Sequence, residues 1–401
     1  MNVDGAGVFR RITSSSVREV LQQAVADARA MTHSWLFTGP PGSGRSIAAD
    51  VFATALVCPQ GGCGTCEHCR SAQAGTHADI VWVRTQGVVI RVDDIRDVIR
   101  DAASMPTVAH RRVIIIENAD RLTPQAANSL LKSVEEPSEH TVFILCAPST
   151  DPQDIAITLR SRCRHVYIPT PSPEAVRNVL LADARLGLTE AQAEWAASVS
   201  GGHIGRARHL ASQEQARAKR ATALRLPGLV YEPTAAYTFA SQLVKHAEQE
   251  AAVSLKEINE AEVAELESSV GMGSTGRGVA RMMTGTKGQF KELEDEQKRR
   301  YRRRVADSLD LALIDIAGLY RDAMLIAAEA EGEAAPVGGF QHPDMEGTSR
   351  ELARRNRPEA LLRCIDAVME CRATLSSTNV PPAVALSALA GRLRECCGVA
   401  S

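Results

Sequence analysis

The stretch from Leu36 to Ser46 has the residue types of a phosphate-binding loop. A short apolar run gives way to glycines, and the apolar spacing of residues 47–53 is helical, so the sequence predicts a strand, a loop and a helix in succession. Such glycines let backbone N–H groups turn towards phosphate oxygens, and the helix start adds partial positive charge. The predicted phosphate-binding residues are Gly39, Pro40, Pro41, Gly42, Ser43, Gly44, Arg45 and Ser46.

One position of this loop departs from the pattern of working nucleotide hydrolases. The pattern G-x-x-x-x-G-K-[ST] asks for lysine where this chain has Arg45, and a planar guanidinium does not replace a compact ammonium freely. Ser46 stands where a hydroxyl would reach Mg²⁺. We therefore expect that ATP with Mg²⁺ could bind here but would not be hydrolysed. A glycine-rich turn without a ligand is the alternative.

A second chemical signal comes from four clustered cysteines. Of the ten cysteines in the chain, four follow the helix predicted after the loop, with spacings of four, two and two residues between them. Four thiolates at such spacing suit tetrahedral zinc, and a site with four protein ligands leaves no position for a reacting water. We expect a structural zinc site in a reducing compartment rather than a disulfide framework. Its ligands would be Cys58, Cys63, Cys66 and Cys69.

The composition limits the classes of function. The chain has 401 residues and a net charge of −2, which allows two or three domains and gives no bulk attraction to nucleic acid or acidic membranes. It contains neither an apolar run long enough for a membrane span nor the N-terminal pattern of a signal peptide. We expect a soluble, cytoplasmic protein that does not contact membranes.

The first 170 residues alternate between strand and helix patterns. Uninterrupted β-branched runs indicate strands buried on both faces of a parallel sheet, and ligands of such sheets gather beyond the carboxyl ends of the strands. Glu117 and Asn118, which follow one such run, should therefore point towards the phosphate-binding loop. Strands are expected in the apolar run that begins at residue 36, at 79–83, 88–92 and 141–146, and in the β-branched run within 112–120, and helices at 17–30, 47–53, 93–103 and 124–135.

The remainder of the chain has helical patterns only. We expect a helical lid over residues 171–225 and an all-α domain over residues 226–401, after an α/β domain at 1–170. Residues 268–288, rich in Ser, Gly and Met, predict a flexible loop. The basic run 298–304 could pair with the acidic residues before it at helical spacing, or it could contact DNA.

Taken together, these residues resemble one family, the clamp-loader ATPases of bacterial DNA polymerase III, and within it the delta-prime branch. The resemblance covers residues 8 to about 210 and is carried by several segments at once. It implies an AAA+ domain of α/β type with an inserted zinc knuckle, a helical lid and an all-α collar. The segments that carry it are residues 33–46, the knuckle 58–69, residues 113–122, the stretch 127–137 with its Leu-Leu-Lys-x-x-Glu-Glu-Pro pattern, and the Ser-Arg-Cys tripeptide within 159–163.

The family pattern implies roles for individual residues. The arginine of Ser-Arg-Cys, here Arg162, would act as an arginine finger on the ATP of a neighbouring subunit. Ser149 would be the family's polar sensor, and Glu117 would stand near the metal. The implied partners are the tau/gamma and delta subunits of the clamp loader, the sliding clamp through the assembly, and primer-template DNA.

The departures from the family pattern imply that this chain does not hydrolyse ATP itself. Asn118 replaces the glutamate that activates water, and an amide cannot accept that proton. Gly205 stands where the lid arginine is expected. With Arg45, three parts of the hydrolytic site are altered, so the resemblance implies a non-hydrolysing subunit. The alternatives are an ATP-hydrolysing tau/gamma-type motor subunit and a metal-dependent regulatory module unrelated to replication.

Overall fold

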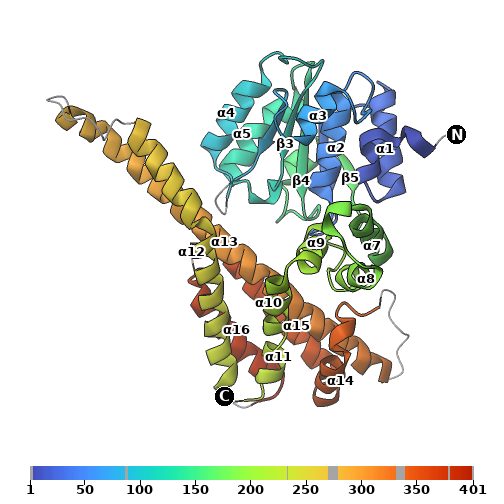
Figure 1. Cartoon of the computed structure of the whole chain (residues 1–401), viewed down its shortest axis with the longest axis vertical. Coiled ribbons are helices and arrows are strands. Elements are labelled where there is room, and N and C mark those ends of the chain that lie inside the picture. The colour runs from blue at the N-terminus through green and yellow to red at the C-terminus, as the bar shows by residue number, and fades with distance from the viewer. Residues whose placement is uncertain are drawn as a thin grey trace. The chain divides into compact units, whose positions relative to one another are not determined.

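The computed structural model describes residues 3–85, 89–232, 234–269, 279–330, 339–377 and 380–399. The chain folds as two compact units, one up to Ser212 and one from Gln213 onward, coloured blue to green and green to red in Figure 1. Within the described helices, no stretch is both long and apolar enough to traverse a lipid bilayer.

The first unit is built on a parallel sheet of five strands in the order β2-β3-β4-β1-β5. All neighbouring strands pair in parallel, so their carboxyl ends meet at one edge, and β1 lies between β4 and β5. This confirms the predicted α/β fold. The strands are β1 (Ser34–Thr38), β2 (Ile80–Val83), β3 (Arg112–Ile116), β4 (Thr141–Ala147) and β5 (Arg164–Tyr167).

Alternating side chains of the strands pack into two separate cores. Trp35 and Phe37 of β1 contact the helices on one face, where the ring centroids of Trp35 and Phe52 are 4.9 Å apart, while Leu36 packs on the other. Helices therefore cover both faces (Figure 1), as buried parallel strands require. The first face carries α1 (Ser15–Ala26), α2 (Arg45–Val57) and α3 (Glu67–Gln73), and the second α4 (Val92–Ala102), α5 (Pro124–Glu135) and the short α6 (Ile157–Arg160).

Three helices with a small apolar core of their own complete the first unit. They are α7 (Pro173–Ala182), α8 (Glu190–Ser198) and α9 (Ile204–Ser212). Ser172 and Thr189 accept backbone N–H bonds at the starts of α7 and α8, which satisfies donors that the first turn leaves unpaired.

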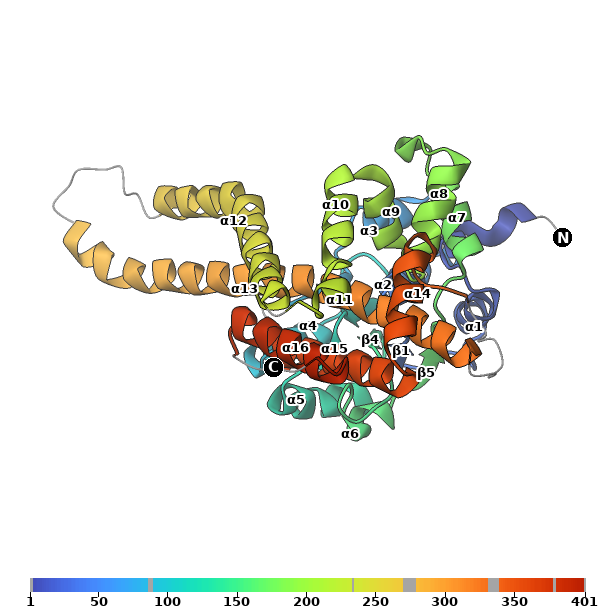
Figure 2. The same ribbon diagram turned by 90° about the horizontal axis from the view of Figure 1, so that it is seen from below.

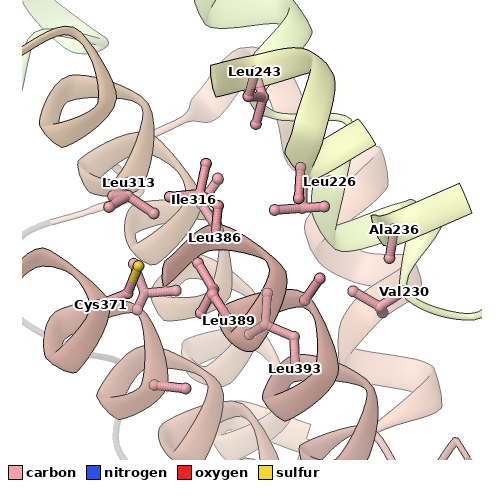
Figure 3. Packing of buried hydrophobic residues seen from close by; sticks show 14 of the residues in the cluster. Leu226, Val230, Ala236, Leu243, Leu313, Ile316, Cys371, Leu386, Leu389 and Leu393 are labelled. Carbon is pink, nitrogen blue, oxygen red and sulfur yellow. The ribbon is translucent and has the colours of Figure 1, made fainter. Parts of the chain in front are cut away.

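The second unit is entirely helical in its described part. Leu313, Ile316, Leu386 and Leu389 form the centre of its core in Figure 3, with Cys371 beside them. Its helices are α10 (Glu214–Ala223), α11 (Leu226–Leu229), α12 (Ala235–Ser269), α13 (Val279–Ala330), α14 (Glu346–Arg355), α15 (Pro358–Ser377) and α16 (Pro382–Cys396).

Some predicted elements differ from the structure. The loop predicted over 268–288 is wrong over its last ten residues, because α13 begins at Val279 despite the glycines, while 270–278 lie outside the described residues. Of the predicted strand 88–92, residue 88 lies outside the described residues, and the rest is reduced to a bridge between Ile90 and Leu122, since α4 already begins at Val92. The helical pattern around residues 346–377 forms two helices, α14 and α15, because the residue before Pro358 disfavours helical geometry.

Candidate functional site

The predicted phosphate-binding loop connects β1 to α2. Gly42 and Gly44 have φ angles of 87° and 93°, in the left-handed region that glycine adopts without strain, and α2 begins at Arg45. The backbone N–H of Ser43 donates to the carbonyl of Pro40 at 3.0 Å, which closes the turn. Ser46 lies in the first turn of α2, whose backbone N–H groups have no helical acceptors. The structure thus brings these loop residues together at a helix start.

Two polar atoms in this loop are buried without a partner. The Oγ atom of Ser43, on a side chain only 2% exposed, and the Nη1 atom of Arg45 make no hydrogen bond. Buried donors without partners cost free energy, and an anion in the loop would satisfy them. The residues present therefore fit a phosphate group.

Acidic side chains surround Arg45 at the carboxyl edge of the sheet. Burial lowers the pKa of Arg45, and nearby acidic groups act in the opposite direction. Burial also raises the pKa of Asp120, one of these groups. The guanidinium therefore lies next to the carboxylates to which a metal ion would bind. The groups that act on Arg45 are Cys146, Asp120, Asp154 and Glu117.

Glu117 is already paired within the chain. Its Oε2 atom accepts a hydrogen bond from Nε of Arg84 at 2.8 Å, and the guanidinium of Arg84 lies 4.1 Å from the ring centroid of Trp82. Asn118, at the next position, offers an amide where a proton-accepting carboxylate would be needed for hydrolysis. A metal ion at Glu117 would have to compete with Arg84.

Ser149 lies beside the phosphate-binding loop but binds an acidic side chain. Its hydroxyl donates to Asp154 at 2.6 Å and accepts from the backbone N–H of Asp151 at 2.9 Å. The neighbouring carbonyl of Pro148 accepts from the N–H of Gly39 at 3.1 Å, which ties the end of β4 to the start of the loop.

The three-helix part of the first unit also reaches the loop, through a residue that the sequence did not single out. A Cβ atom added to Gly42 would lie 2.4 Å from the Cβ of His203. Burial lowers the pKa of His203, and its Nδ1 accepts from the backbone N–H of Arg206, so the ring is neutral near pH 7. A Cβ atom added to Gly205 would lie 3.2 Å from the Cε1 atom of the same ring. No local pattern in the sequence predicts this contact, because it joins residues 161 positions apart.

Arg162 lies away from this cluster, on the exposed surface between α6 and β5. Its Nε atom is 2.9 Å from Oε2 of Glu135 at the end of α5, and its Nη1 donates to the carbonyl of Thr158 at 2.9 Å. The guanidinium therefore remains accessible, and its counter-ion comes from the same unit.

The four predicted zinc ligands converge. Their Sγ atoms all lie within 4.8 Å of one another, with 3.8 Å between Cys58 and Cys63 and 3.6 Å between Cys58 and Cys66. Zinc with Zn–S bonds of about 2.3 Å holds sulfurs about 3.8 Å apart in a tetrahedron. Backbone N–H groups of Thr65 and Cys66 lower the pKa of Cys63 to about 6, which favours the thiolate. With Cys69 as fourth ligand, the cluster fits a structural zinc ion.

The knuckle is held at both ends by the first unit. Cys58 caps the C-terminus of α2, and Cys66 caps the N-terminus of α3. The backbone N–H of Val8 donates to the carbonyl of Gly62 at 2.9 Å, and a side chain at Gly7 would lie 2.0 Å from that oxygen. The N-terminal segment therefore packs directly on the metal-binding loop.

Comparisons with known proteins agree with this architecture. Residues 13–172 match a family model described as "DNA polymerase III, delta subunit". The DNA polymerase III subunit delta' of Bacillus subtilis is 31% identical over 168 residues, which are 41% of this chain and 50% of the relative. That of Pseudomonas aeruginosa is 36% identical over 149 residues, 36% of this chain and 45% of the relative.

A related group is also similar. The DNA polymerase III subunit gamma/tau of Mycobacterium tuberculosis is 33% identical over 186 residues, 43% of this chain and 32% of the relative. The chain spans about half the length of the delta' relatives that it matches. In its parallel α/β fold, its four-cysteine cluster and these matches, the chain is similar through residues 13–172 to the DNA polymerase III delta' subunit family.

Proposed function

We propose that this chain is the delta' subunit of a DNA polymerase III clamp loader and acts as a stator that does not hydrolyse ATP. In this role it holds its neighbours in register while the sliding clamp is loaded onto primed DNA. It also supplies Arg162 in trans to the ATP of an adjacent tau/gamma subunit. The similarity of residues 13–172 to this family supports the assignment.

The observation that carries the proposal is the contrast between Arg162 and the chain's own phosphate-binding loop. Arg162 is exposed and is bound by one carboxylate and one carbonyl, from which it can be released at small cost. A guanidinium at the developing charge of a transferring phosphoryl group increases the rate by about 10³–10⁵-fold. Arg162 is therefore suited to work outside its own unit.

The chain's own loop has lost parts that hydrolysis needs. Asn118 cannot serve as a general base, and Gly205 offers no charge to the phosphates. Glu117 is engaged by Arg84, and Arg45 stands where lysine is expected. These four features together favour a site that can hold nucleotide but does not turn it over.

We propose that the loop binds ATP with Mg²⁺ and that the cysteines bind zinc. Ser43 and Arg45 would satisfy their unpartnered atoms on phosphate oxygens, and Ser46 would reach the metal. Glu117 and Ser149 flank the same edge of the sheet. Zinc with four thiolate ligands would hold the knuckle together without taking part in the reaction.

The proposed partners follow from the same assignment. They are the tau/gamma subunits, the delta subunit, the sliding clamp through the assembly, and primer-template DNA. We propose three working domains, an AAA+ domain at 1–170, a lid at 171–225 and a collar at 226–401, the last of which would join the subunits. The protein would act in the cytoplasm.

Reconstitution of the clamp loader with Arg162→Ala tests the proposal. We expect the ATPase activity stimulated by clamp and primed DNA to fall strongly, while the variant still assembles with its partners. Arg160→Ala, at a neighbouring exposed arginine, is the matched control and should retain activity. Unchanged ATPase activity and clamp loading with Arg162→Ala would refute the role in trans.

The similarity to gamma/tau relatives favours one alternative, an ATP-hydrolysing motor subunit. The purified chain would then hydrolyse ATP, and Ser46→Ala would abolish the activity. We expect no hydrolysis by the chain alone.

A further inference from the structure

Helices α12 and α13 extend well beyond the core of the second unit. Among the side chains that the structure describes, the last buried residue of α12 is Leu255, and the first buried residue of α13 is Val305. Figures 1 and 2 both show the two helices side by side and extending away from α15 and α16. We call residues 256–268 of α12 and 288–304 of α13 the arm.

Polar contacts fix which side of α13 faces α12 in the arm. Nη2 of Arg300 lies 2.7 Å from Oε1 of Glu262, and Nε2 of Gln297 donates to the same carboxylate at 3.2 Å. Arg299 and Arg302 are one and two residues from Arg300, so the helical period of 3.6 turns them away from α12. Both side chains are exposed.

A dense block of positive charge covers the outer side of the arm. Residues 298–304 contain one lysine and five arginines. Lys298 pairs with Glu294 at 2.5 Å and Arg303 with Asp307 at 3.6 Å. Arg299 and Arg302 on the outer side have no carboxylate within ion-pair distance in the described part of the chain, nor has Arg304, which is exposed on the side of α13 that carries Arg300.

We propose that this basic block, residues 298–304, binds the phosphate backbone of double-stranded DNA independently of sequence. Side chains three and four positions apart on a helix lie about 5–6 Å apart, a spacing that lets neighbouring arginines contact neighbouring phosphates of one strand. Arginine also binds phosphate in a planar, two-pronged geometry that lysine lacks.

The charge of α12 would determine which side of the arm faces DNA. The exposed charged residues of α12 in the arm are four glutamates and Lys256, so α12 would be repelled by the phosphates and α13 would face them. The glutamates are Glu257, Glu260, Glu265 and Glu267.

The surroundings of the block favour DNA over an acidic protein. Stable protein interfaces have apolar or aromatic anchors at their centre. Among the described residues, none of the exposed large apolar side chains lies between Ile258 and Leu311. A purely cationic, arginine-rich surface is suited to counterion release from phosphates.

The test is binding of a fluorescent duplex of random sequence to the intact chain, measured by anisotropy over a series of salt concentrations. Each phosphate contact contributes about 0.9 to the slope of log affinity against log salt concentration. For Arg299→Ala/Arg302→Ala/Arg304→Ala we expect affinity at low salt to fall about tenfold or more and the slope to decrease in magnitude by about 3. Alanine favours helix, so the arm should keep its helical content in circular dichroism.

A second triple variant controls for net charge. Arg96, Arg100 and Arg350 are exposed, lie on helices and already pair with acidic neighbours at helical spacing. Their replacement by alanine changes the net charge equally and should leave affinity and slope near those of the unaltered chain. Equal losses in both variants, or no binding of duplex by the intact chain, would overturn the proposal. Absence of duplex binding by the intact chain would favour an acidic protein as the ligand. Since the assay needs no other subunit, it fails or succeeds separately from the role of Arg162.

Discussion

Glu135 holds Arg162 by two contacts, 2.9 Å between Oε2 and Nε and 3.3 Å between Oε1 and Nη2. The carboxylate lies at the end of α5, in the Glu-Glu-Pro segment, and the arginine lies in the Ser-Arg-Cys tripeptide. Two of the segments that carry the family resemblance are thus joined by one exposed ion pair.

The ion pair between Glu135 and Arg162 should affect the proposed role of Arg162 in trans. Arg162 must leave Glu135 before it can bind a neighbour's triphosphate, and an exposed pair contributes about 0.2–1 kcal/mol. Glu135→Gln should therefore increase the apparent affinity of the reconstituted loader for ATP by up to about fivefold, without loss of maximal rate. Glu136→Gln, also exposed, is the control. A fall in maximal rate with Glu135→Gln would mean that the carboxylate orients the arginine instead of restraining it.

A second prediction concerns the contact between Gly42 and His203. An alanine at position 42 would have to adopt a left-handed φ of 87°, and its Cβ would lie 2.4 Å from the Cβ of His203. An alanine at position 44 would have to adopt a φ of 93°, but its Cβ would have no atom within 4 Å. Backbone strain alone costs about 1–2 kcal/mol. Gly42→Ala should lower the unfolding midpoint of the first unit more than Gly44→Ala does. Tryptophan fluorescence reports this directly, since Trp35, Trp82 and Trp195 are the chain's three tryptophans and all lie in that unit.

Acid stability should depend on Asp79. This fully buried carboxylate accepts backbone N–H bonds from Thr107, Val108 and Ala109 and pairs with Arg112 at 3.4 Å. Burial raises the pKa of Asp79, but these hydrogen bonds outweigh it, so the pKa in the folded state lies below its ordinary value.

The sign of the pH dependence follows. A carboxyl with a depressed folded pKa stabilises the fold above its unfolded pKa of about 3.9, and this stability is lost as pH falls through the folded pKa. Asp79→Asn should destabilise the first unit by about 2 kcal/mol at pH 7, and the difference should shrink at the acid end. Urea unfolding of both proteins between pH 7 and pH 3 measures this difference in the free energy of unfolding. Asp97→Asn, at an exposed carboxylate paired with Arg100, should have little effect at any pH.

Metal removal should act locally on the knuckle and the segment packed on it. Cys63→Ser or chelation should release about one zinc per chain, because structural zinc is held by all its ligands together. Hydrogen exchange should then increase at residues 7–12 and 58–75, since Val8 donates to Gly62 in the knuckle. Cys371→Ser, at a buried cysteine of the second unit, is the control and should leave the metal content unchanged. Unchanged exchange after complete zinc loss would contradict the structural role.

Restoring the missing parts should restore turnover. Arg45→Lys/Asn118→Glu/Gly205→Arg returns a compact cation, a general base and a lid arginine to the loop, so we expect the triple variant to hydrolyse ATP slowly and the unaltered chain not at all. Addition of Ser46→Ala should abolish the activity in a phosphate-release assay. An unaltered chain that hydrolyses ATP would contradict the proposed stator.

Much of the first unit could be predicted because local signals and tertiary packing agree there. The β-branched residues of β3 and β4 can be buried only in a parallel sheet, and the glycines at 42 and 44 fit one loop conformation. The run 88–92 has the same residue types but is not a strand, since α4 already begins at Val92. The convergence of the four cysteines could be predicted from their spacing alone.

The remaining features depend on contacts between distant residues. The pairs Arg84–Glu117, Arg162–Glu135 and Ser149–Asp154 follow from the register of strands and loops, which the sequence does not encode locally. The lengths of α12 and α13 cannot be predicted from apolar periodicity, because the sequence pattern of the arm is polar. Pairing of the two helices through Arg300 and Glu262 supports the extension.

Helix α2 joins the two chemical sites of the first unit. It begins at Arg45 in the phosphate-binding loop and ends at Val57, next to the zinc ligand Cys58. Thirteen residues of α-helix form a rod about 20 Å long. Zinc at the four cysteines would therefore anchor the far end of the rod whose near end would present amide groups to a nucleotide. Metal content would then set how firmly the nucleotide end is positioned, although no proposed zinc ligand touches it.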